Sequence, residues 1–314
     1  MTKRRKPRNR NESMKGRKRD NIPRPTLLLT DMNLEGRNDF TQRVNLISPN
    51  DMKTIELDVR RSVAHWDVHR QLSESRRDLM RSSLLKMIIQ LVCSIRGFRY
   101  YQGVHEVCLV VLQASGGDVS RSVRVCRQIF LRHFGDLIYR DFAHSLNPLL
   151  EFLQILTEYL DPELARVIEV SGVGYHFAVP WILTWFAHSI DRFGVLSILF
   201  TRLAKSAVDG RILIVYFCFE VIRQLRDKIF ANRNDSCMIF KTLQSSHRYI
   251  NWKRVIVDSK NRYDRYPPSL VLSGYPTMLK SLDTSCYVER WSPSFLLCVI
   301  ICFIGLLCSL LSIY

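Results

Sequence analysis

Several common signatures of protein chemistry are absent from this 314-residue sequence. Its nine cysteines form no Cys-x-x-Cys pair and no zinc-like cluster with histidine, so we expect free thiols and no metal site. The eight histidines have no obvious nucleophile partner. There is no glycine-rich phosphate loop, so the chain itself is not expected to bind a nucleotide tightly. The charged N-terminus has no apolar core, which argues against a secretory signal and favours the reducing cytosol.

Positive charge is unevenly distributed along the chain. The formal net charge is +17, and residues 1–24 hold eleven Lys and Arg against two acidic residues, a net of +9. Residues 1–39 are therefore predicted to be a basic, disordered arm. Aromatic residues, which single-strand binders use for base stacking, are absent from residues 1–38, so no specific nucleic acid partner is predicted. The arm is interpreted as a solvated tail, as a clamp on anionic lipid or as a nuclear-localisation-like run, and the lipid clamp is the functional interpretation that best suits an anchored protein.

The last twenty residues, 295–314, carry no charge. As one helix they would span about 30 Å, the thickness of the hydrocarbon core of a bilayer. Trp291 and Tyr314 suit the two membrane interfaces. The alternative is a buried core helix, which usually shows a polar face, whereas only Ser309 and Ser312 interrupt this run. We therefore predict a single transmembrane helix that acts as a tail anchor, with everything before it on the cytosolic side.

Between these ends, apolar residues recur with helical spacing. In residues 73–95 they recur at intervals of three and four, which predicts a helix facing a core. Further helices are predicted over residues 51–70, 105–114, 119–134, 148–159, 162–169, 175–189, 195–207 and 209–226. No run alternates with the period of a strand for long enough to predict a sheet, so we expect an all-α, multi-helix domain over residues 40–230. Residues 231–294 are polar and mixed, which is typical of a tether, either bare or with short packed segments.

Two short motifs on this helical sequence indicate a chemistry. They are Ile55-x-x-Asp58-x-x-Arg61 and, about forty residues later, Tyr100-x-Gln102-Gly103. Arginine suits the stabilisation of a phosphoryl group in transit, because a guanidinium stays charged and forks to two oxygens. Glutamine can hold an attacking water in line. Arg61 and Gln102 are therefore the candidate catalytic residues.

Three neighbours support this pair. Asp58 lies one helical turn before Arg61, at the spacing from which a carboxylate can orient the arginine. Tyr100 flanks the glutamine, and Gly103 permits close approach of the backbone. Taken singly, Arg61 is an ordinary surface arginine and Gln102 an ordinary loop residue. The two motifs together favour the catalytic interpretation.

The motif pair resembles the two finger motifs of the TBC-domain family, the GTPase-activating proteins for Rab GTPases. The run Trp181-Ile182-Leu183-Thr184-Trp185-Phe186 is similar to a third signature of that family, a tryptophan-rich core helix. This resemblance covers about residues 50–230. It implies that Arg61 is an arginine finger and that Gln102 substitutes for the Rab's own glutamine. It also implies no cofactor of the chain's own, because the partner Rab carries GTP and magnesium.

Tyr-Tyr-Gln-Gly-x-His, Val173-Gly174 and the hydrophobic tail are most similar to a membrane-anchored member of the family. That similarity implies a Rab of the early secretory pathway and a place on the endoplasmic reticulum membrane or early Golgi, in vesicle trafficking. Family members usually carry an Arg-x-x-x-Trp element before the arginine motif, whereas no tryptophan precedes Trp66 here. The intact Arg61 and Gln102 favour a GTPase activator acting in trans. The N-terminal departure favours the alternative, a membrane-tethered Rab-binding adaptor with weak or no activity.

Overall fold

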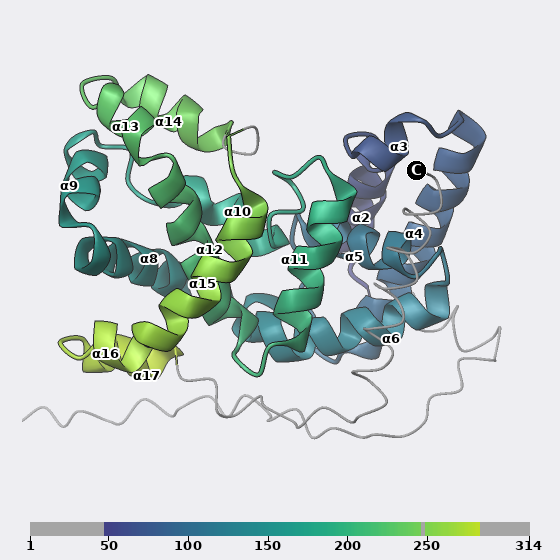
Figure 1. Cartoon of the computed structure of the whole chain (residues 1–314). Helices are drawn as coiled ribbons and strands as arrows, with labels where there is room; N and C mark the ends of the chain where they lie inside the picture. Colours follow the sequence, from purple (N-terminus) through teal and green to yellow (C-terminus); the bar gives the residue numbers. More distant parts are fainter. Residues whose placement is uncertain (1–46, 246–248, 283–314) are drawn as a thin grey trace, which may run out of the picture. The chain divides into compact units, whose positions relative to one another are not determined.

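The computed structural model describes residues 47–245 and 249–282 (Figure 1). All regular secondary structure in these residues is helical, which confirms the predicted all-α class. The first half contains α2 (Pro49–Arg61), α3 (Asp67–Arg70), α4 (Glu74–Ser94), α5 (Val104–Ala114), α6 (Val119–Ile129), a π turn (Phe130–Phe134), a 3-10 turn (Gly135–Ile138), α7 (Phe142–Ser145), α8 (Asn147–Leu160) and α9 (Pro162–Val170). The second half contains a 3-10 turn (His176–Ala178), α10 (Val179–Thr184), α11 (Phe193–Lys205), α12 (Gly210–Gln224), α13 (Arg226–Ala231), α14 (Ser236–Gln244), α15 (Trp252–Arg265), α16 (Pro268–Val271) and α17 (Pro276–Leu282).

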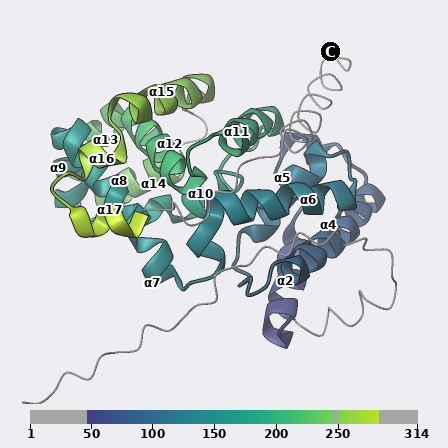
Figure 2. The same cartoon turned by 90° about the horizontal axis from the view of Figure 1, so that it is seen from below.

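Helix α12 lies at the centre of the core. Every residue from Gly210 to Ile222 is buried, which is the pattern of a helix enclosed on all sides. Its N-cap is Asp209, whose carboxylate accepts a hydrogen bond from the backbone N–H of Arg211. Helices α8, α10, α11 and α15 pack against it, and Figure 2 shows α12 between α8 and α15. In both views α2–α6 lie on the side of the domain away from α8 and α9. The candidate site residues Arg61 and Gln102 belong to this part of the chain.

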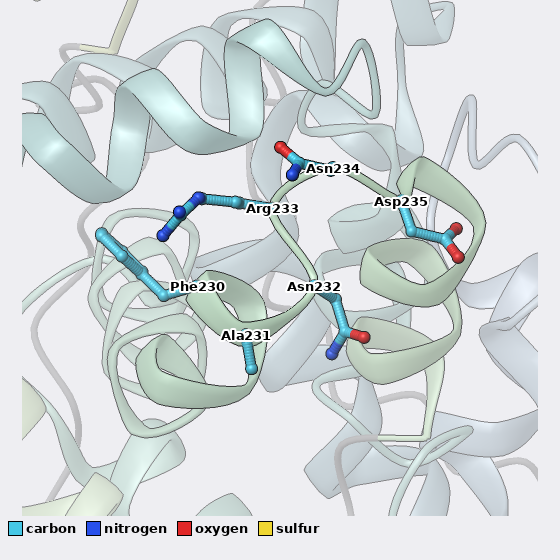
Figure 3. Close-up of a pocket in the computed structure, with 6 residues that line it drawn as sticks. All are labelled: Phe230, Ala231, Asn232, Arg233, Asn234 and Asp235. Atoms are coloured by element: carbon cyan, nitrogen blue, oxygen red, sulfur yellow. The ribbon is translucent and has the colours of Figure 1, made fainter.

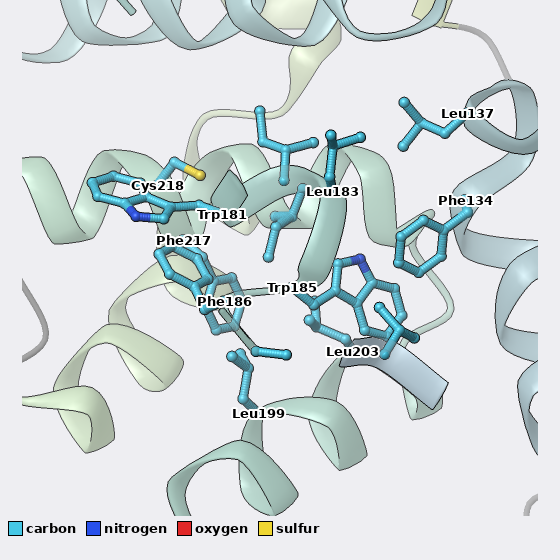
Figure 4. Close-up of a cluster of buried hydrophobic side chains, with 14 of the residues drawn as sticks. Phe134, Leu137, Trp181, Leu183, Trp185, Phe186, Leu199, Leu203, Phe217 and Cys218 are labelled. Atoms are coloured by element: carbon cyan, nitrogen blue, oxygen red, sulfur yellow. The ribbon is translucent and has the colours of Figure 1, made fainter. Parts of the chain in front are cut away.

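A tryptophan-rich turn follows α10. One helix is predicted over residues 175–189, but α10 ends early, and Trp185 and Phe186 have positive φ angles of 50° and 63°. Left-handed backbone costs roughly 1–2 kcal/mol per residue. Here it turns Trp185 onto Phe134, with ring centroids 4.9 Å apart, while Phe186 stacks on Trp181 at 5.2 Å. Figure 4 shows these four rings in one buried cluster, and the burial of such large rings offsets the strain.

The prediction of one continuous helix over residues 51–70 is wrong in its middle, where the helix is interrupted. Helix α2 ends at Arg61, the following Val63 has a φ of 64°, and α3 begins only at residue 67. The physical reason is the burial of Val63 and Trp66, which are both fully buried. Trp66 Nε1 donates a hydrogen bond to the carbonyl of Ala187 at 3.2 Å, and this contact draws the chain toward the turn after α10. Arg61 is therefore the last residue of α2.

Residues 236–245 and 249–282 are not a bare polar tether, and of the two forms left open for 231–294 they match the one with packed segments. They form α14 to α17, and α15 packs along α12. Trp252 is 3% exposed, and its ring meets that of Phe186 edge-on at 5.3 Å. Most residues of this stretch are polar, but a narrow stripe of side chains on α15 faces the core. In α15 the buried side chains are Trp252, Val255, Ile256 and Ser259.

Two predictions fall outside the described residues, namely the basic arm over 1–39 and the anchor over 295–314. The domain predicted from residue 40 is described from residue 47 onward. Within the described ranges, no helix combines the length and hydrophobicity needed to cross a bilayer.

Candidate functional site

Arg61 projects from the end of α2 and is paired with Asp58. The Arg61 side chain is 53% exposed, and its Nη2 lies 2.5 Å from Oδ1 of Asp58, one turn earlier. The Asp58 side chain is only 3% exposed. A single amino group of the guanidinium makes this contact, so the carboxylate orients the arginine and leaves its other N–H groups able to meet an incoming anion.

The same carboxylate joins α2 to the loop that carries Gln102. The Tyr100 hydroxyl donates a hydrogen bond to Oδ2 of Asp58 at 2.8 Å, and Nδ1 of His105 lies 3.1 Å from the same oxygen. Burial by itself raises the pKa of the Asp58 carboxyl, but its contacts with His105, Tyr100 and Arg61 outweigh burial and hold that pKa below its usual value. Burial also raises the pKa of the Tyr100 phenol, which therefore remains a donor.

Gln102 is exposed in the turn just before α5 and directly follows two tyrosines that are held by hydrogen bonds. Tyr100 is tied to α2, and the Tyr101 hydroxyl donates a hydrogen bond to the carbonyl of Leu183 in α10 at 3.1 Å. Gly103 has a φ of 122°, and a Cβ at this position would lie 2.9 Å from Cγ2 of Thr184, so only glycine fits. The loop is thus tied to α2 and to α10, and the Asp58 carboxylate links it to Arg61.

Glu106 and His188 also belong to this site, although the sequence motifs did not identify them. Glu106 is in the first turn of α5, and His188 lies in the turn after α10. His188 Nδ1 lies 2.7 Å from Oε1 of Glu106. The Glu106 hydrogen bond raises the pKa of His188, and the charge of Arg61 acts in the opposite direction. The two partners are far apart in the sequence, so no local pattern links them.

Arg61 and Gln102 are both exposed at the surface. Two pockets in the described part of the chain lie elsewhere, and neither Arg61 nor Gln102 lines them. The first follows the turn from Phe230 to Asp235, where Figure 3 shows the side chains fanning outward. Within residues 47–245 and 249–282, no group of three or more His, Cys, Asp and Glu is arranged to hold a metal ion. An open face of this kind suits a macromolecular partner better than a small molecule.

The sequence matches the family described as Rab-GTPase-TBC domain over residues 30–230. TBC1 domain family member 20 of Homo sapiens is 23% identical over 220 residues, which cover 70% of this chain and 52% of that protein. GTPase-activating protein gyp10 of Schizosaccharomyces pombe is 23% identical over 179 residues, 57% of this chain and 45% of that protein. TBC domain-containing protein kinase-like protein of Mus musculus is 23% identical over 199 residues, 62% of this chain and 21% of that protein. The chain spans about half the length of the first two of these relatives.

Proposed function

The chain belongs to the Rab-GTPase-TBC domain family, and we propose that it accelerates GTP hydrolysis by a Rab GTPase through Arg61 and Gln102. One observation carries the proposal. The buried Asp58 carboxylate binds Arg61 on one oxygen and Tyr100 on the other, so a single group positions the arginine and the glutamine loop together. Both Arg61 and Gln102 remain exposed. Such an arrangement is ready to act on a partner's nucleotide.

The chemistry follows from the two side chains. The Rab supplies GTP and magnesium, so this chain needs to add only charge stabilisation and water alignment. The Arg61 guanidinium meets the charge that develops on the phosphoryl oxygens. The Gln102 amide orients the attacking water in place of the Rab's own glutamine.

A single-turnover assay tests the proposal directly. The full chain is added to a panel of purified Rab GTPases loaded with GTP, and the release of phosphate is followed. We expect at least one Rab of the early secretory pathway to be stimulated strongly. Binding without stimulation would instead identify the chain as a Rab-binding adaptor.

The role of Gln102 has its own test. A Rab whose catalytic glutamine is replaced by leucine should still respond to the wild-type chain, because Gln102 takes over the water. The same Rab should not respond to the Gln102→Ala variant. If that variant stimulates both Rabs normally, Gln102 is structural and Arg61 acts as the one finger.

We further propose that residues 295–314 anchor the chain in the endoplasmic reticulum membrane, and that residues 1–39 bind anionic lipid there. The supports are the uncharged run of twenty residues and the net charge of the basic arm. A fluorescent fusion at the N-terminus should mark the endoplasmic reticulum and resist carbonate extraction. Deletion of 295–314 should release it without changing its activity in solution, and a deleted chain that stays on the membrane would contradict the anchor.

A further inference from the structure

Glu106 and His188 make a hydrogen-bonded pair close enough to Arg61 for its charge to act on His188. Glu106 follows Gly103 by three residues, so the turn that presents Gln102 leads directly into it. The Glu106 side chain is 11% exposed, whereas the His188 side chain is 62% exposed. Burying a carboxylate is costly unless it is paired. Here the buried carboxylate holds an imidazole whose other side is open to solvent.

The pairing is specific to one oxygen of the carboxylate. Oε1 of Glu106 meets His188 Nδ1 at 2.7 Å, with His105 Nε2 at 3.8 Å. Oε2 of Glu106 is buried and has no hydrogen-bond partner in the described part of the chain. The backbone N–H of His188 donates to Oγ1 of Thr184 at 3.2 Å, which fixes the start of the side chain. His188 is therefore held at its backbone and at Nδ1, while Nε2 is left for a partner.

His188 lies within the electrostatic field of the finger residues. The charge of Arg61 acts on His188, and His188 in turn acts on His65, which follows α2. The charged and titratable groups that act on His188 are Glu106 on α5, Arg61 on α2 and His65 beyond α2. His105 of α5 lies next to Glu106, and Asp58 of α2 lies next to His105. Only Glu106 among them bonds to the ring of His188.

We propose that His188, held by Glu106, is a third side chain with which this face contacts the GTPase, and that it binds an anionic group of the GTPase–nucleotide complex beside Arg61. The inference rests on the proposed function. The anion is either a carboxylate of the GTPase or a phosphate oxygen of the nucleotide. His188 is then a contact residue, and Glu106 is a positioning residue that acts through it.

The proposed contact should depend on pH, because it requires His188 to be protonated. Its hydrogen bond with Glu106 raises the pKa of His188 above the usual value of 6.5. Below that raised pKa the ring is a cation, in which Nδ1–H serves Glu106 and Nε2–H can donate to an anion. Above it the ring loses its charge, and Nε2 becomes an acceptor that no longer suits an anion. Stimulated hydrolysis should therefore fall as the pH rises through the raised pKa.

The test uses single-turnover hydrolysis by the full chain on a stimulated Rab GTPase. His188→Ala and His188→Gln should lower stimulation by roughly 10- to 100-fold, the range for a lost hydrogen bond to a charged group. A carboxylate partner predicts a raised KM with an unchanged kcat, and a phosphate partner predicts a lowered kcat. His144→Ala is the matched control, because its Nδ1 meets Asp141 at 2.7 Å on a similarly exposed side chain of α7. It should leave stimulation unchanged.

The pH profile separates a contact from a structural role. His188→Ala should remove the decline of stimulation at rising pH, and Glu106→Gln should move its midpoint to lower pH, because it withdraws the charge that raises the pKa. The inference is overturned if the folded His188 variants stimulate hydrolysis to within about twofold of wild type, or if Glu106→Gln leaves the pH profile unchanged. Either result leaves the proposed roles of Arg61 and Gln102 untouched. A wild-type chain that stimulates no Rab overturns the proposed function itself, and this inference with it.

Discussion

Asp58 and Glu220 are two buried carboxylates that each bind an arginine, and the two pairs differ in what they do for the molecule. Each pairs with the arginine one turn later on its own helix, Asp58 with Arg61 at 2.5 Å and Glu220 with Arg223 at 2.6 Å. The carboxylate side chains are 3% and 0% exposed. Glu220 also accepts a hydrogen bond from Arg262 of α15 at 2.8 Å, so it joins two helices.

The difference lies in what else each arginine touches. Arg223 reaches a second carboxylate, Asp258, at 3.1 Å, and its side chain is 29% exposed. Among the described residues Arg61 bonds to Asp58 alone, and its side chain is 53% exposed. A guanidinium shared by two carboxylates is occupied in holding α12 to α15, whereas one held by a single oxygen is oriented and still available. The same spacing therefore builds a structural clamp in one place and orients an exposed arginine, the proposed finger, in the other.

The largest expected effect is the loss of stimulated hydrolysis in Arg61→Ala. Arginine fingers contribute roughly 10³ to 10⁵ in rate, or about 4–7 kcal/mol of barrier. The free energy of unfolding should change little in Arg61→Ala, because the Arg61 side chain is half exposed and the Asp58 carboxylate keeps its hydrogen bond from Tyr100. Arg61→Lys should also fail, because a lysine cannot fork to two oxygens.

Two neighbouring substitutions are the controls for that experiment. Arg60→Ala changes the adjacent exposed arginine and should keep near-normal stimulation. Arg223→Ala should show the opposite behaviour to Arg61→Ala, with normal stimulation and a lower free energy of unfolding. Near-normal hydrolysis by Arg61→Ala would remove the distinction between finger and clamp.

The next largest effect is on stability, in Glu220→Ala. Removing one partner of a buried ion pair costs about 3–5 kcal/mol, because the remaining charge is left uncompensated. Arg223 and Arg262 are 29% and 26% exposed and can turn partly to water, which favours the lower end of that range. Urea unfolding followed by circular dichroism measures the change.

Glu74→Ala is the matched control for Glu220→Ala. Glu74 also pairs with two arginines, Arg77 and Arg81, but its side chain is 62% exposed. Exposed pairs contribute about 0–1 kcal/mol, so this variant should unfold close to wild type. Equal losses in the two variants would mean that burial does not decide the strength of these clamps.

The Asp58–Arg61 contact could be predicted from the sequence and the Glu220 clamp could not, for a physical reason. Asp58 and Arg61 lie within one turn of one helix, so their contact follows from helical periodicity alone. The clamp depends on Arg262, which is 42 residues beyond Glu220 on a helix that was interpreted as part of a tether. Its apolar stripe is narrow, and the polar remainder of α15 obscures it.

The ends of two helices were also mispredicted, and here tertiary packing overrides local preference. Val63, Trp185 and Phe186 all adopt positive φ, which β-branched and aromatic residues rarely do. What stabilises these turns is the burial of rings such as Trp66 and Trp185 against distant partners. Local pattern cannot report such contacts, although the position of Arg61 depends on one of them.

A smaller effect on stimulated hydrolysis and on stability is expected for Asp58→Asn. This variant tests whether Asp58 contributes to activity or only to stability. Asparagine keeps an acceptor for Tyr100 but removes the charge that orients Arg61. We expect stimulation to fall by roughly tenfold or more and the free energy of unfolding to fall by about 1–3 kcal/mol. Hydrolysis and urea unfolding are measured on the same preparation. If stability falls and stimulation stays normal, Asp58 is a clamp like Glu220.

The smallest expected effect is the pH dependence of the Asp58 contribution. Burial alone raises the pKa of Asp58, but its contacts with His105, Tyr100 and Arg61 hold the native pKa below the usual value. A carboxyl with a depressed native pKa contributes stability that is fully present above its unfolded pKa of about 3.9 and is lost as the pH falls through the native pKa. The difference in free energy of unfolding between wild type and Asp58→Asn should therefore be constant above about pH 5 and shrink below pH 4, by at most about 1.4 kcal/mol per pH unit. Urea unfolding of both chains from pH 7 to pH 3 measures it, and a difference that stays constant or grows toward low pH would contradict the ionised, finger-orienting state of Asp58.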